Sequence, residues 1–359
     1  MITENNQPAK KSKLTDLKIG FLPVNSLDVS EASRRRFYWY AEKRGLSFEI
    51  ADVKKKYDLV VLTQSADISM WCNYPYGKII YELVDSYLAI PKTNIKGLLR
   101  GSAKSISGQY KHFRLSHWKA IQDMCERSDA VVCTTLEQKI DISPYCENVS
   151  VVLDSFEKVA TTVKTDYTSK GIFKIVWEGQ PSNAYQIHLL KNVLRKLESK
   201  FHIEFHVVTD LFTHQFLNKY RKISITSQVR KDFPNAIVHA WNKDDLSRIV
   251  CSCDVAVIPI DLKDALTAGK PENKLLLFWE MGMPTVTSAT KAYDRAMKTA
   301  GTPLSCANDD EWLEALTNLI ESSALRKQMG ERGLKCVATR YNYESKLKQW
   351  DEVFRSIGL

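Results

Sequence analysis

Long hydrophobic runs are absent from this 359-residue sequence, and no apolar segment stands near its start. A membrane-spanning helix needs about 18 or more consecutive apolar residues, so none is expected. A secretory signal needs an apolar core, which the first residues lack. We therefore interpret residues 1–16 as a disordered polar tail and expect a cytoplasmic protein.

Cysteine spacings typical of zinc sites are also missing. Among the eight cysteines only Cys251 and Cys253 lie close together, and no second Cys or His pair completes a set of four ligands. No D-x-D sequence occurs, so we expect no catalytic metal ion. No G-x-G-x-x-G occurs, which argues against a dehydrogenase. We expect no bound cofactor.

Acidic residues are fewer than basic ones, 42 against 51, which gives a net charge of +9. Such an excess is compatible with nucleic acid, with an anionic membrane or with phosphorylated small molecules. The excess is spread over both halves of the chain, and no nucleic-acid-recognition motif stands out. We therefore expect no nucleic-acid partner.

Basic charge concentrates in one segment, residues 89–120, which has seven Lys or Arg side chains and no acidic one. Near an anionic lipid surface each such side chain contributes about 1 kcal/mol. Arg100 and Lys104 in this segment are therefore predicted on the acceptor or membrane side. Peripheral attachment at the inner face of the cell membrane is the corresponding prediction, and an exposed basic loop without a ligand is the alternative.

Short apolar runs alternate with helical patterns along the chain, as in parallel α/β proteins. Strands are predicted at residues 17–23, 47–51, 59–62, 78–83, 130–133, 149–153, 173–177, 204–208, 236–239, 255–259 and 284–287. Helices are predicted at 32–44 (with Ser30 as N-cap), 116–127, 137–142, 184–197, 244–250, 273–281 and 343–357. The strand runs are apolar throughout, which favours parallel strands buried on both faces.

Periodicity disappears between residues 158 and 171, where Thr, Ser and Lys dominate, and we interpret this segment as a linker. The sequence thus predicts a Rossmann-like domain over 17–157, a second one over 172–340 and a terminal helical segment over 341–359. Doubly wound domains bind ligands at the carboxyl ends of their strands, so a site between the two domains is expected.

The sharpest functional signal is the sequence KPENKLLLFWEMGMPTV, from Lys270 to Val286. Pro271 is favoured at the start of a helix and Gly282 at its end. Glu272 is therefore expected at the N-terminus of this helix and Glu280 two turns later. The free N–H groups and the positive end of such a helix bind phosphate. An acidic first turn also stabilises any helix, so the spacing alone leaves both interpretations open.

Glu272, seven residues, Glu280 and then Gly-x-Pro-x-Val resembles the E-x7-E motif of retaining GT-B glycosyltransferases, family 4 in particular. In that family the first Glu contacts the donor sugar, the second contacts the ribose, and amides after the first Glu contact the diphosphate. The resemblance implies these roles for Glu272, Glu280 and the amides near Asn273 and Lys274, with Glu272 and Lys274 among the catalytic residues. It also implies a C-terminal helix that crosses back to the first domain.

Other segments are similar to the same family. Residues 175–179 (IVWEG) resemble the first strand and glycine turn of its C-terminal domain, and residues 239–241 (HAW) resemble a segment near the nucleotide base. Gly179, His239 and Trp241 are therefore expected to bind the donor. Lys270 is expected to offset phosphate charge.

In the first domain, residues 34–36 (RRR) enter the first predicted helix, where an Arg faces the cleft in some relatives. Arg35 and Arg36 are expected on the acceptor side, with a solvated basic helix face as the alternative. Asp85 ends an apolar strand and is expected to point into the cleft as a catalytic residue, with a loop anchor as the alternative.

The resemblance implies a retaining glycosyltransferase that moves a sugar from a nucleotide-sugar donor to a glycan or lipid-linked acceptor, as in surface polysaccharide synthesis. The sequence departs from the family at residues 178–183 (EGQPSN), where many relatives carry a basic pair that binds the diphosphate. A nucleotide-sugar epimerase of the same fold and a catalytically inactive GT-B binding module are the alternatives.

Overall fold

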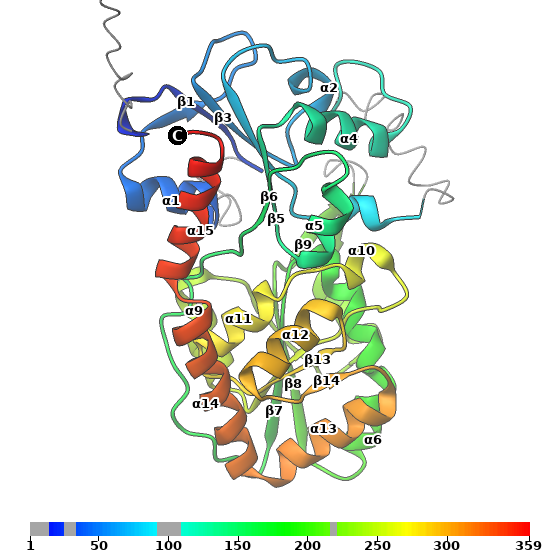
Figure 1. Cartoon of the computed structure of the whole chain (residues 1–359). Helices are drawn as coiled ribbons and strands as arrows, with labels where there is room; N and C mark the ends of the chain where they lie inside the picture. The colour runs from blue at the N-terminus through cyan, green and yellow to red at the C-terminus, as the bar shows by residue number, and fades with distance from the viewer. Residues whose placement is uncertain (1–13, 25–33, 92–108, 216–220) are drawn as a thin grey trace, which may run out of the picture.

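Two α/β domains, one above the other in Figure 1, make up the computed structural model of this chain. The structure describes residues 14–24, 34–91, 109–215 and 221–359. Each domain has a six-stranded sheet in which all neighbouring strands are parallel. The predicted pair of parallel α/β domains is therefore confirmed. No helix within these described ranges is both long and apolar enough to cross a membrane.

The first sheet has the strand order β2-β1-β3-β4-β5-β6. Its strands are β1 (Ile19–Leu22), β2 (Phe48–Ile50), β3 (Leu59–Thr63), β4 (Lys78–Glu82), β5 (Ala130–Cys133) and β6 (Val149–Val151). Successive side chains of a strand point to opposite faces. Leu59 and Val61 accordingly pack in one core with helix α1 (Phe37–Arg44), whereas Val60 and Leu62 pack in another with helix α4 (His117–Arg127).

Capping residues mark the helix ends of the first domain. Ser116 accepts a hydrogen bond from the Lys119 N–H at the start of α4, and Thr135 accepts one from the Gln138 N–H at the start of α5 (Leu136–Ile142). Gly45, with φ 64°, ends α1. The shorter helices are η1 (Leu14–Asp16), α2 (Ile68–Trp71) and η3 (Tyr87–Ala89).

Two expectations for the start of the chain differ from the structure. Residues 14–16 form η1 and Leu14 packs against the core, so the tail is not disordered up to residue 16. The first α-helix begins at Phe37 rather than at residue 32, because Arg36 has non-helical backbone angles and turns its side chain inward. Ser30, the expected N-cap, lies outside the described residues.

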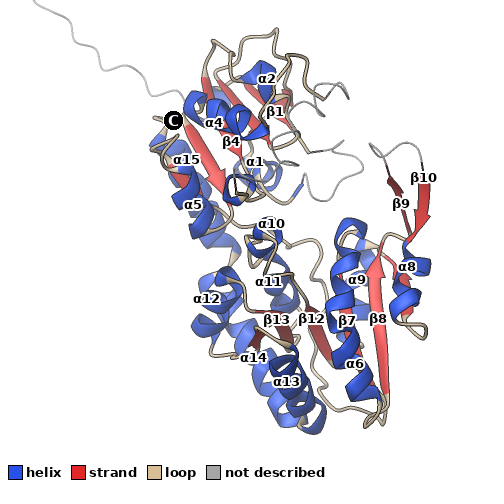
Figure 2. Ribbon diagram, turned by 90° about the vertical axis from the view of Figure 1, so that its right-hand side faces the viewer, coloured by secondary structure: helices blue, strands red, loops and turns tan. Residues whose placement is uncertain are grey.

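The second sheet has the strand order β11-β8-β7-β12-β13-β14. Its strands are β7 (Phe173–Glu178), β8 (Ile203–Thr209), β11 (Ile237–Ala240), β12 (Val255–Ile258), β13 (Thr285–Ser288) and β14 (Ser305–Cys306). In Figure 2 the arrowhead of β8 points toward the first domain. Because all six strands are parallel, their carboxyl ends lie at the edge of the sheet that faces that domain.

Helices cover both faces of the second sheet. They are η4 (Pro181–Leu190), α6 (Lys191–Glu198), α8 (Ile225–Asp232), α9 (Lys243–Cys251), α10 (Ala265–Ala268), α11 (Asn273–Glu280), α12 (Lys291–Ala300), α13 (Asp309–Glu321) and α14 (Ser323–Arg340). The predicted helix 184–197 is in fact the 3-10 helix η4 followed by α6. The antiparallel pair β9 (Phe212–Gln215) and β10 (Arg221–Ser224) was not predicted.

The segment between the domains is fixed to the second one. Lys164 is buried and its ammonium group donates to the carbonyl oxygens of Cys251 and Cys253, at 3.1 and 2.8 Å. The Tyr167 hydroxyl donates to the carbonyl of Gly282 at 2.8 Å. The predicted linker, residues 158–171, lacks periodic apolar residues because it is an extended segment that packs against the second domain.

The C-terminal helix α15 (Tyr343–Ser356) follows α14 and crosses to the first domain (red in Figure 1). Trp350 stacks on Tyr40 with ring centroids 5.6 Å apart, and Phe354 packs beside Phe37. The Tyr40 hydroxyl donates to Asp351 at 2.9 Å. One face of the first sheet is therefore covered by the end of the chain.

Replacing Trp350 by alanine should lower the free energy of unfolding by about 3–5 kcal/mol, because a buried aromatic ring leaves a cavity. Trp350 is 1% exposed, whereas the Lys348 side chain on the same helix is 70% exposed. Lys348→Ala is the matched control, and urea unfolding followed by tryptophan fluorescence and circular dichroism is the measurement. Equal stability of the two variants would contradict the covering role of α15.

Candidate functional site

Helix α11 is buried along its whole length. Five consecutive side chains, from Leu275 to Trp279, are no more than 3% exposed. A helix that is apolar on all sides offers polar groups only at its two ends. Glu272 is the N-cap residue, and Gly282, with φ 68°, allows the turn into β13. The N-terminal end faces the first domain, and the free N–H groups of its first turn lie there.

A pocket of about 180 Å³, here called the α11 pocket, lies against this N-terminal end. It is lined by Asp85, Trp177, Asn183, Gln186, Ile258, Pro259, Ile260, Lys270, Pro271, Asn273, Lys274 and Tyr293. It lies beyond the carboxyl ends of β7 and β12, which are neighbours in the sheet although far apart in the chain. Such a switch point is where open α/β sheets bind their ligands.

Two lysines give the α11 pocket its positive charge. Lys270 donates to the side-chain oxygen of Asn183 at 2.6 Å, and burial, with the nearby charge of Lys274, lowers the pKa of Lys270 to about 8. Lys274 donates to the carbonyl oxygen of Glu178 and lies 5.0 Å from the ring centre of Trp177. Burial also lowers the pKa of Lys274. Both ammonium groups have lost hydration, and an anion beside them would restore favourable interactions.

Asp85 lines the α11 pocket from the first domain, as its position at a strand end predicted. Its carboxylate accepts from the Gln64 amide at 2.8 Å, and its own N–H donates to the Gln64 side-chain oxygen at 2.9 Å. The next residue, Ser86, donates to the carbonyl of Gly269 in the second domain at 2.9 Å. Asp85 is thus held rigidly where the two domains meet.

Gly179 is not among the residues that line the α11 pocket, but it affects the position of a residue that does. A Cβ atom at this position would lie 2.6 Å from the Lys274 ammonium nitrogen and 2.7 Å from the Trp177 ring. The absence of a side chain therefore lets Lys274 reach the end of β7. Gly179 thus leaves the room in which Lys274 lies, and its contact with a donor stays a prediction.

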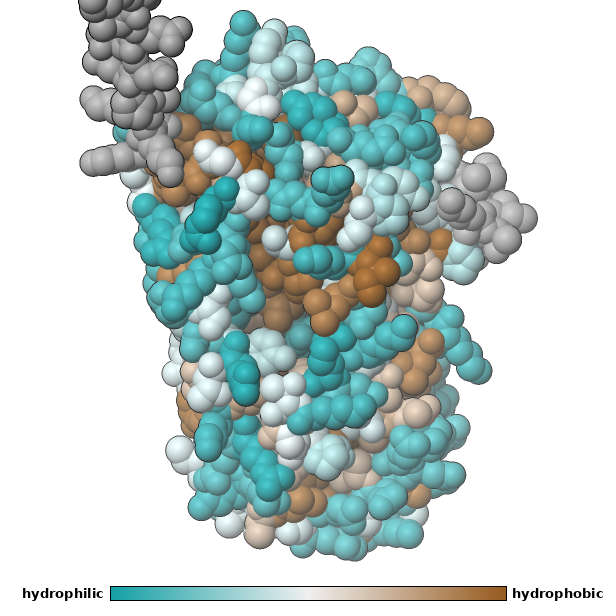
Figure 3. Space-filling model, viewed as in Figure 1, coloured by the Kyte–Doolittle hydropathy of each residue, from teal (hydrophilic) through white to brown (hydrophobic). Residues whose placement is uncertain are grey.

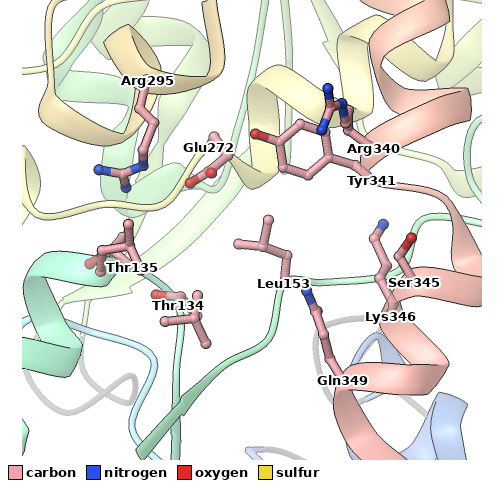
Figure 4. A pocket seen from close by; sticks show the side chains of 12 residues that line it. Thr134, Thr135, Leu153, Glu272, Arg295, Arg340, Tyr341, Ser345, Lys346 and Gln349 are labelled. Atoms are coloured by element: carbon pink, nitrogen blue, oxygen red, sulfur yellow. The ribbon is translucent and has the colours of Figure 1, made fainter. Parts of the chain in front are cut away.

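Glu272 points into a second hollow, of about 260 Å³, whose lining side chains are drawn in Figure 4. We call it the α15 hollow; it is lined by Thr134, Thr135, Leu136, Val151, Leu153, Glu272, Arg295, Arg340, Tyr341, Ser345, Lys346 and Gln349. Figure 4 shows the Glu272 carboxylate between Arg295 and Tyr341. Glu272 is 6% exposed, and burial raises the pKa of its carboxyl to about 7. Glu272 therefore lines the α15 hollow and not the α11 pocket, and its contact with a donor sugar stays a prediction.

Glu280 is also turned away from the α11 pocket. Its carboxylate accepts from the Tyr343 hydroxyl at 3.0 Å and lies 3.7 Å from the Lys346 ammonium group, both on α15. Glu280 lies eight residues after Glu272, so the two side chains point in directions about 80° apart around the helix axis. That rotation carries Glu280 toward the crossing helix, where it contacts α15. Its contact with a ribose stays a prediction.

His239 and Trp241 do not line the α11 pocket either. The His239 ring stacks on that of His206, with the two facing nitrogens 3.0 Å apart, and burial lowers the pKa of both imidazoles. Trp241 is partly buried against the core of the second domain. These residues pack at the β8–β11 side of the sheet, so the predicted contact with a base has no counterpart in the α11 pocket.

The four basic residues predicted for the acceptor side lie in different surroundings. Arg36 is buried and forms ion pairs with Glu82 and Asp154, both at 3.2 Å, so it holds the first domain together. The Arg35 guanidinium lies 4.9 Å from the ring centre of Phe156. Arg100 and Lys104 lie outside the described residues.

Eight of the twelve residues that line the α11 pocket were not predicted as site residues, and Trp177, Gln186 and Tyr293 are among them. Trp177 belongs to the apolar run that predicts β7, so its position near the carboxyl end was the available signal. Tyr293 lies in the first turn of α12, directly after β13. Both follow from the rule that strand ends and the turns after them surround the ligand.

No protein-family model matches the sequence, and no curated protein matches it. Solved structures do match. Sucrose-phosphate synthase from Thermosynechococcus elongatus has a TM-score of 0.58 at 11% identity, over 89% of this chain and 76% of its own. A glycosyltransferase from Rickettsia africae has a TM-score of 0.56 at 11% identity, over 94% and 89%. The protein has the GT-B fold.

The structure of TarM gives a TM-score of 0.57 at 11% identity, over 82% of this chain. This chain spans about half of TarM, 54% of its length. Similarity at such low identity reports on the fold. The GT-B fold agrees with the resemblance of the sequence and with the helix α15 that crosses between the domains.

Replacing Glu272 by glutamine should change how stability depends on pH. The folded pKa of about 7 lies above the ordinary value of 4.5, so between these values the folded protein binds a proton that the unfolded chain has lost. Stability therefore falls as pH rises from 4.5 to 7, by about 3 kcal/mol in total. Glu272→Gln removes this loss.

Between pH 5 and pH 8 the free energy of unfolding should accordingly fall less in Glu272→Gln than in the wild type, as measured by urea unfolding. Glu331→Gln is the control, because the Glu331 side chain is 58% exposed on α14. Parallel pH profiles for the wild type and Glu272→Gln would show that the Glu272 carboxyl is not in a water-poor site.

Proposed function

We propose that this chain is a retaining glycosyltransferase that moves a sugar from a nucleotide-sugar donor, bound in the α11 pocket, to a glycan or lipid-linked acceptor. The observation that carries the proposal is the pairing of a helix N-terminus with two half-buried lysines at the switch point of the second sheet. This combination suits a diphosphate, because backbone N–H groups and ammonium groups both stabilise phosphate charge.

Two fold neighbours were solved with ligands of this kind. A variant of S. aureus TarM was crystallised with fondaparinux, alpha-GlcNAc-glycerol and UDP. The E. coli trehalose-6-phosphate protein was bound with UDP-2-fluoro glucose. Both resemble this chain at 11% identity or less, so their ligands support the class of donor and leave its base and sugar open.

In the proposed reaction the acceptor hydroxyl attacks the anomeric carbon from the face that the diphosphate leaves. The bond between the anomeric carbon and the diphosphate oxygen breaks, and the acceptor proton passes to that oxygen. The protein has to stabilise the charge that develops on the leaving phosphate, which the first turn of α11, Lys270 and Lys274 are placed to do. Asp85, held by Gln64 on the opposite wall, is placed to orient a sugar hydroxyl.

An inactive GT-B binding module is the second candidate, and one observation favours it. The Glu178 carboxylate lies 3.6 Å from the Lys274 ammonium group, where relatives of the resembled family present basic residues to the diphosphate. A donor has to compete with this carboxylate for Lys274. A nucleotide-sugar epimerase would use the same pocket without an acceptor, and product analysis in the absence of acceptor separates it from a transferase.

A panel of UDP, GDP, ADP and CDP, each at 1–5 mM, is the first test, because a ligand that binds only the folded protein raises its melting temperature. At least one nucleoside diphosphate should raise the melting temperature by several degrees. Its sugar conjugates should then be hydrolysed or transferred slowly. The proposal fails if none of the four nucleotides shifts the transition.

The affinity for that nucleotide should fall as the pH rises above about 8, where free Lys270 loses its proton. Bound phosphate favours the ammonium form, so affinity is constant at lower pH and declines by up to about tenfold per pH unit above it. Lys270→Met should weaken binding about tenfold at pH 7 and flatten this decline, since a hydrogen bond to a charged group contributes about 1.5–3 kcal/mol.

Lys263→Met is the matched control, because Lys263 is an exposed lysine in the same connection between β12 and α11. Isothermal titration at pH 6.5, 7.5, 8.5 and 9.5 gives both quantities. Equal losses in the two variants would move the nucleotide away from the α11 pocket.

A further inference from the structure

The α15 hollow is separate from the α11 pocket although both touch the start of α11. The two share none of their lining residues. Between them the Asn273 side-chain oxygen accepts from the Asp154 N–H at 3.1 Å, which joins the second domain to the segment after β6. A ligand in one cavity therefore meets different side chains from a ligand in the other.

Three buried polar atoms in the α15 hollow have no hydrogen-bond partner. They are Oε2 of Glu272, Nζ of Lys346 and Oε1 of Gln349. Glu272 is 6% exposed and Lys346 is 2% exposed, and the ion pair of Lys346 with Glu280, at 3.7 Å, is too long for a hydrogen bond. Buried polar groups are nearly always hydrogen-bonded in folded proteins. Three of them around one hollow indicate that a bound molecule completes the site.

The orphaned atoms also restrict the chemistry of that molecule. Glu272 and Gln349 offer acceptors, so the ligand must donate hydrogen bonds, while Lys346 offers a donor, so the ligand must also accept. Two of the three cations around the hollow are offset by carboxylates outside it, Arg295 by Glu137 at 2.9 Å and Lys346 by Glu280 at 3.7 Å. Arg340 and Glu272 then carry opposite charges, so the hollow as a whole favours neither a cation nor an anion. A neutral molecule with several hydroxyl groups meets all of these requirements.

The remaining wall of the hollow is apolar. Val151, Leu153 and the ring of Tyr341 line it, and Figure 3 shows apolar residues gathered on this face between the domains. A sugar ring has apolar C–H faces and hydroxyls at its edge, which matches an apolar wall with polar groups around it. The volume of about 260 Å³ is several times the 30 Å³ or so that one water occupies.

We propose that the α15 hollow is a second carbohydrate site, which binds one neutral pyranose unit at a place separate from the nucleotide-sugar. The hollow is lined by α5 of the first domain, α12 of the second and the crossing helix α15. A bound sugar contacts all three elements and so holds the two domains together. This proposal goes beyond the proposed glycosyl transfer and does not depend on it.

The experiment measures binding of methyl glucoside, methyl galactoside and methyl N-acetylglucosaminide, without nucleotide, by saturation-transfer NMR and by titration. At least one of them should bind with a Kd on the order of 1–10 mM, as expected for a small ligand with few atoms. Binding should persist in Lys270→Met and in the presence of the nucleotide that fills the α11 pocket. That behaviour separates this site from the donor site.

Gln349→Leu removes one orphaned acceptor at nearly constant volume and should weaken sugar binding about tenfold, as for one lost hydrogen bond. Gln328→Leu is the matched control, since Gln328 is exposed on α14. Circular dichroism and the melting temperature establish that both variants fold. Arg340→Ala, at an exposed position on the rim, is a second variant that tests the same hollow.

Three outcomes overturn the proposal. In the first, none of the three sugars binds at 50 mM, which would mean that water alone fills the hollow. Alternatively, binding is lost in Lys270→Met or displaced by nucleotide and unchanged in Gln349→Leu, which places the sugar in the donor site. Finally, inorganic phosphate binds to the hollow while the neutral sugars do not, which assigns the site to anions.

Discussion

The buried position of α11 constrains both cavities of this protein. Its apolar side chains are enclosed by the second sheet and by α14, where Gly333 allows the Trp279 ring to approach closely. A helix held on all sides cannot rotate to satisfy a ligand. The directions of Glu272, Asn273, Lys274 and Glu280 are therefore fixed by packing, and ligands have to fit the groups that this packing presents.

Glu280 illustrates the consequence. Spacing alone places two carboxylates two turns apart, but spacing says nothing about which neighbours surround the helix. Because α15 crosses beside the C-terminal end of α11, Glu280 meets Tyr343 and Lys346 there. The same contact couples the position of α11 to the helix that covers the first domain. A motif that is read as a donor site in the sequence is therefore, at its second residue, part of the joint between the domains.

The architecture was predictable because its signals are local. Apolar runs such as residues 59–62 and 130–133 became buried parallel strands, and caps such as Ser116 marked helix starts. Secondary structure was predicted wrongly where the local sequence is compatible with more than one conformation. Residues 181–190 form a 3-10 helix that begins at a proline, and β9 and β10 pair with each other although neither is an apolar run.

The lining of the candidate site was predictable in part, and the division has a physical cause. Asp85, Lys270, Asn273 and Lys274 lie in the α11 pocket because strand ends and helix starts meet at the carboxyl edge of parallel sheets. The direction of a side chain, by contrast, depends on tertiary contacts. Arg36 turns inward to Glu82, a partner 46 residues away, and that contact removes it from the surface.

The two cavities meet at one hydrogen bond, between Asn273 and the backbone of Asp154. Among the described residues, the ion pair of Arg295 with Glu137 at 2.9 Å and the bond from Ser86 to Gly269 also span the domains. Arg295 lines the α15 hollow, whereas Ser86 adjoins Asp85 in the α11 pocket. Opening the domains would therefore break contacts at both cavities together. A ligand in either cavity stabilises the same closed arrangement, so by linkage each ligand strengthens the binding of the other.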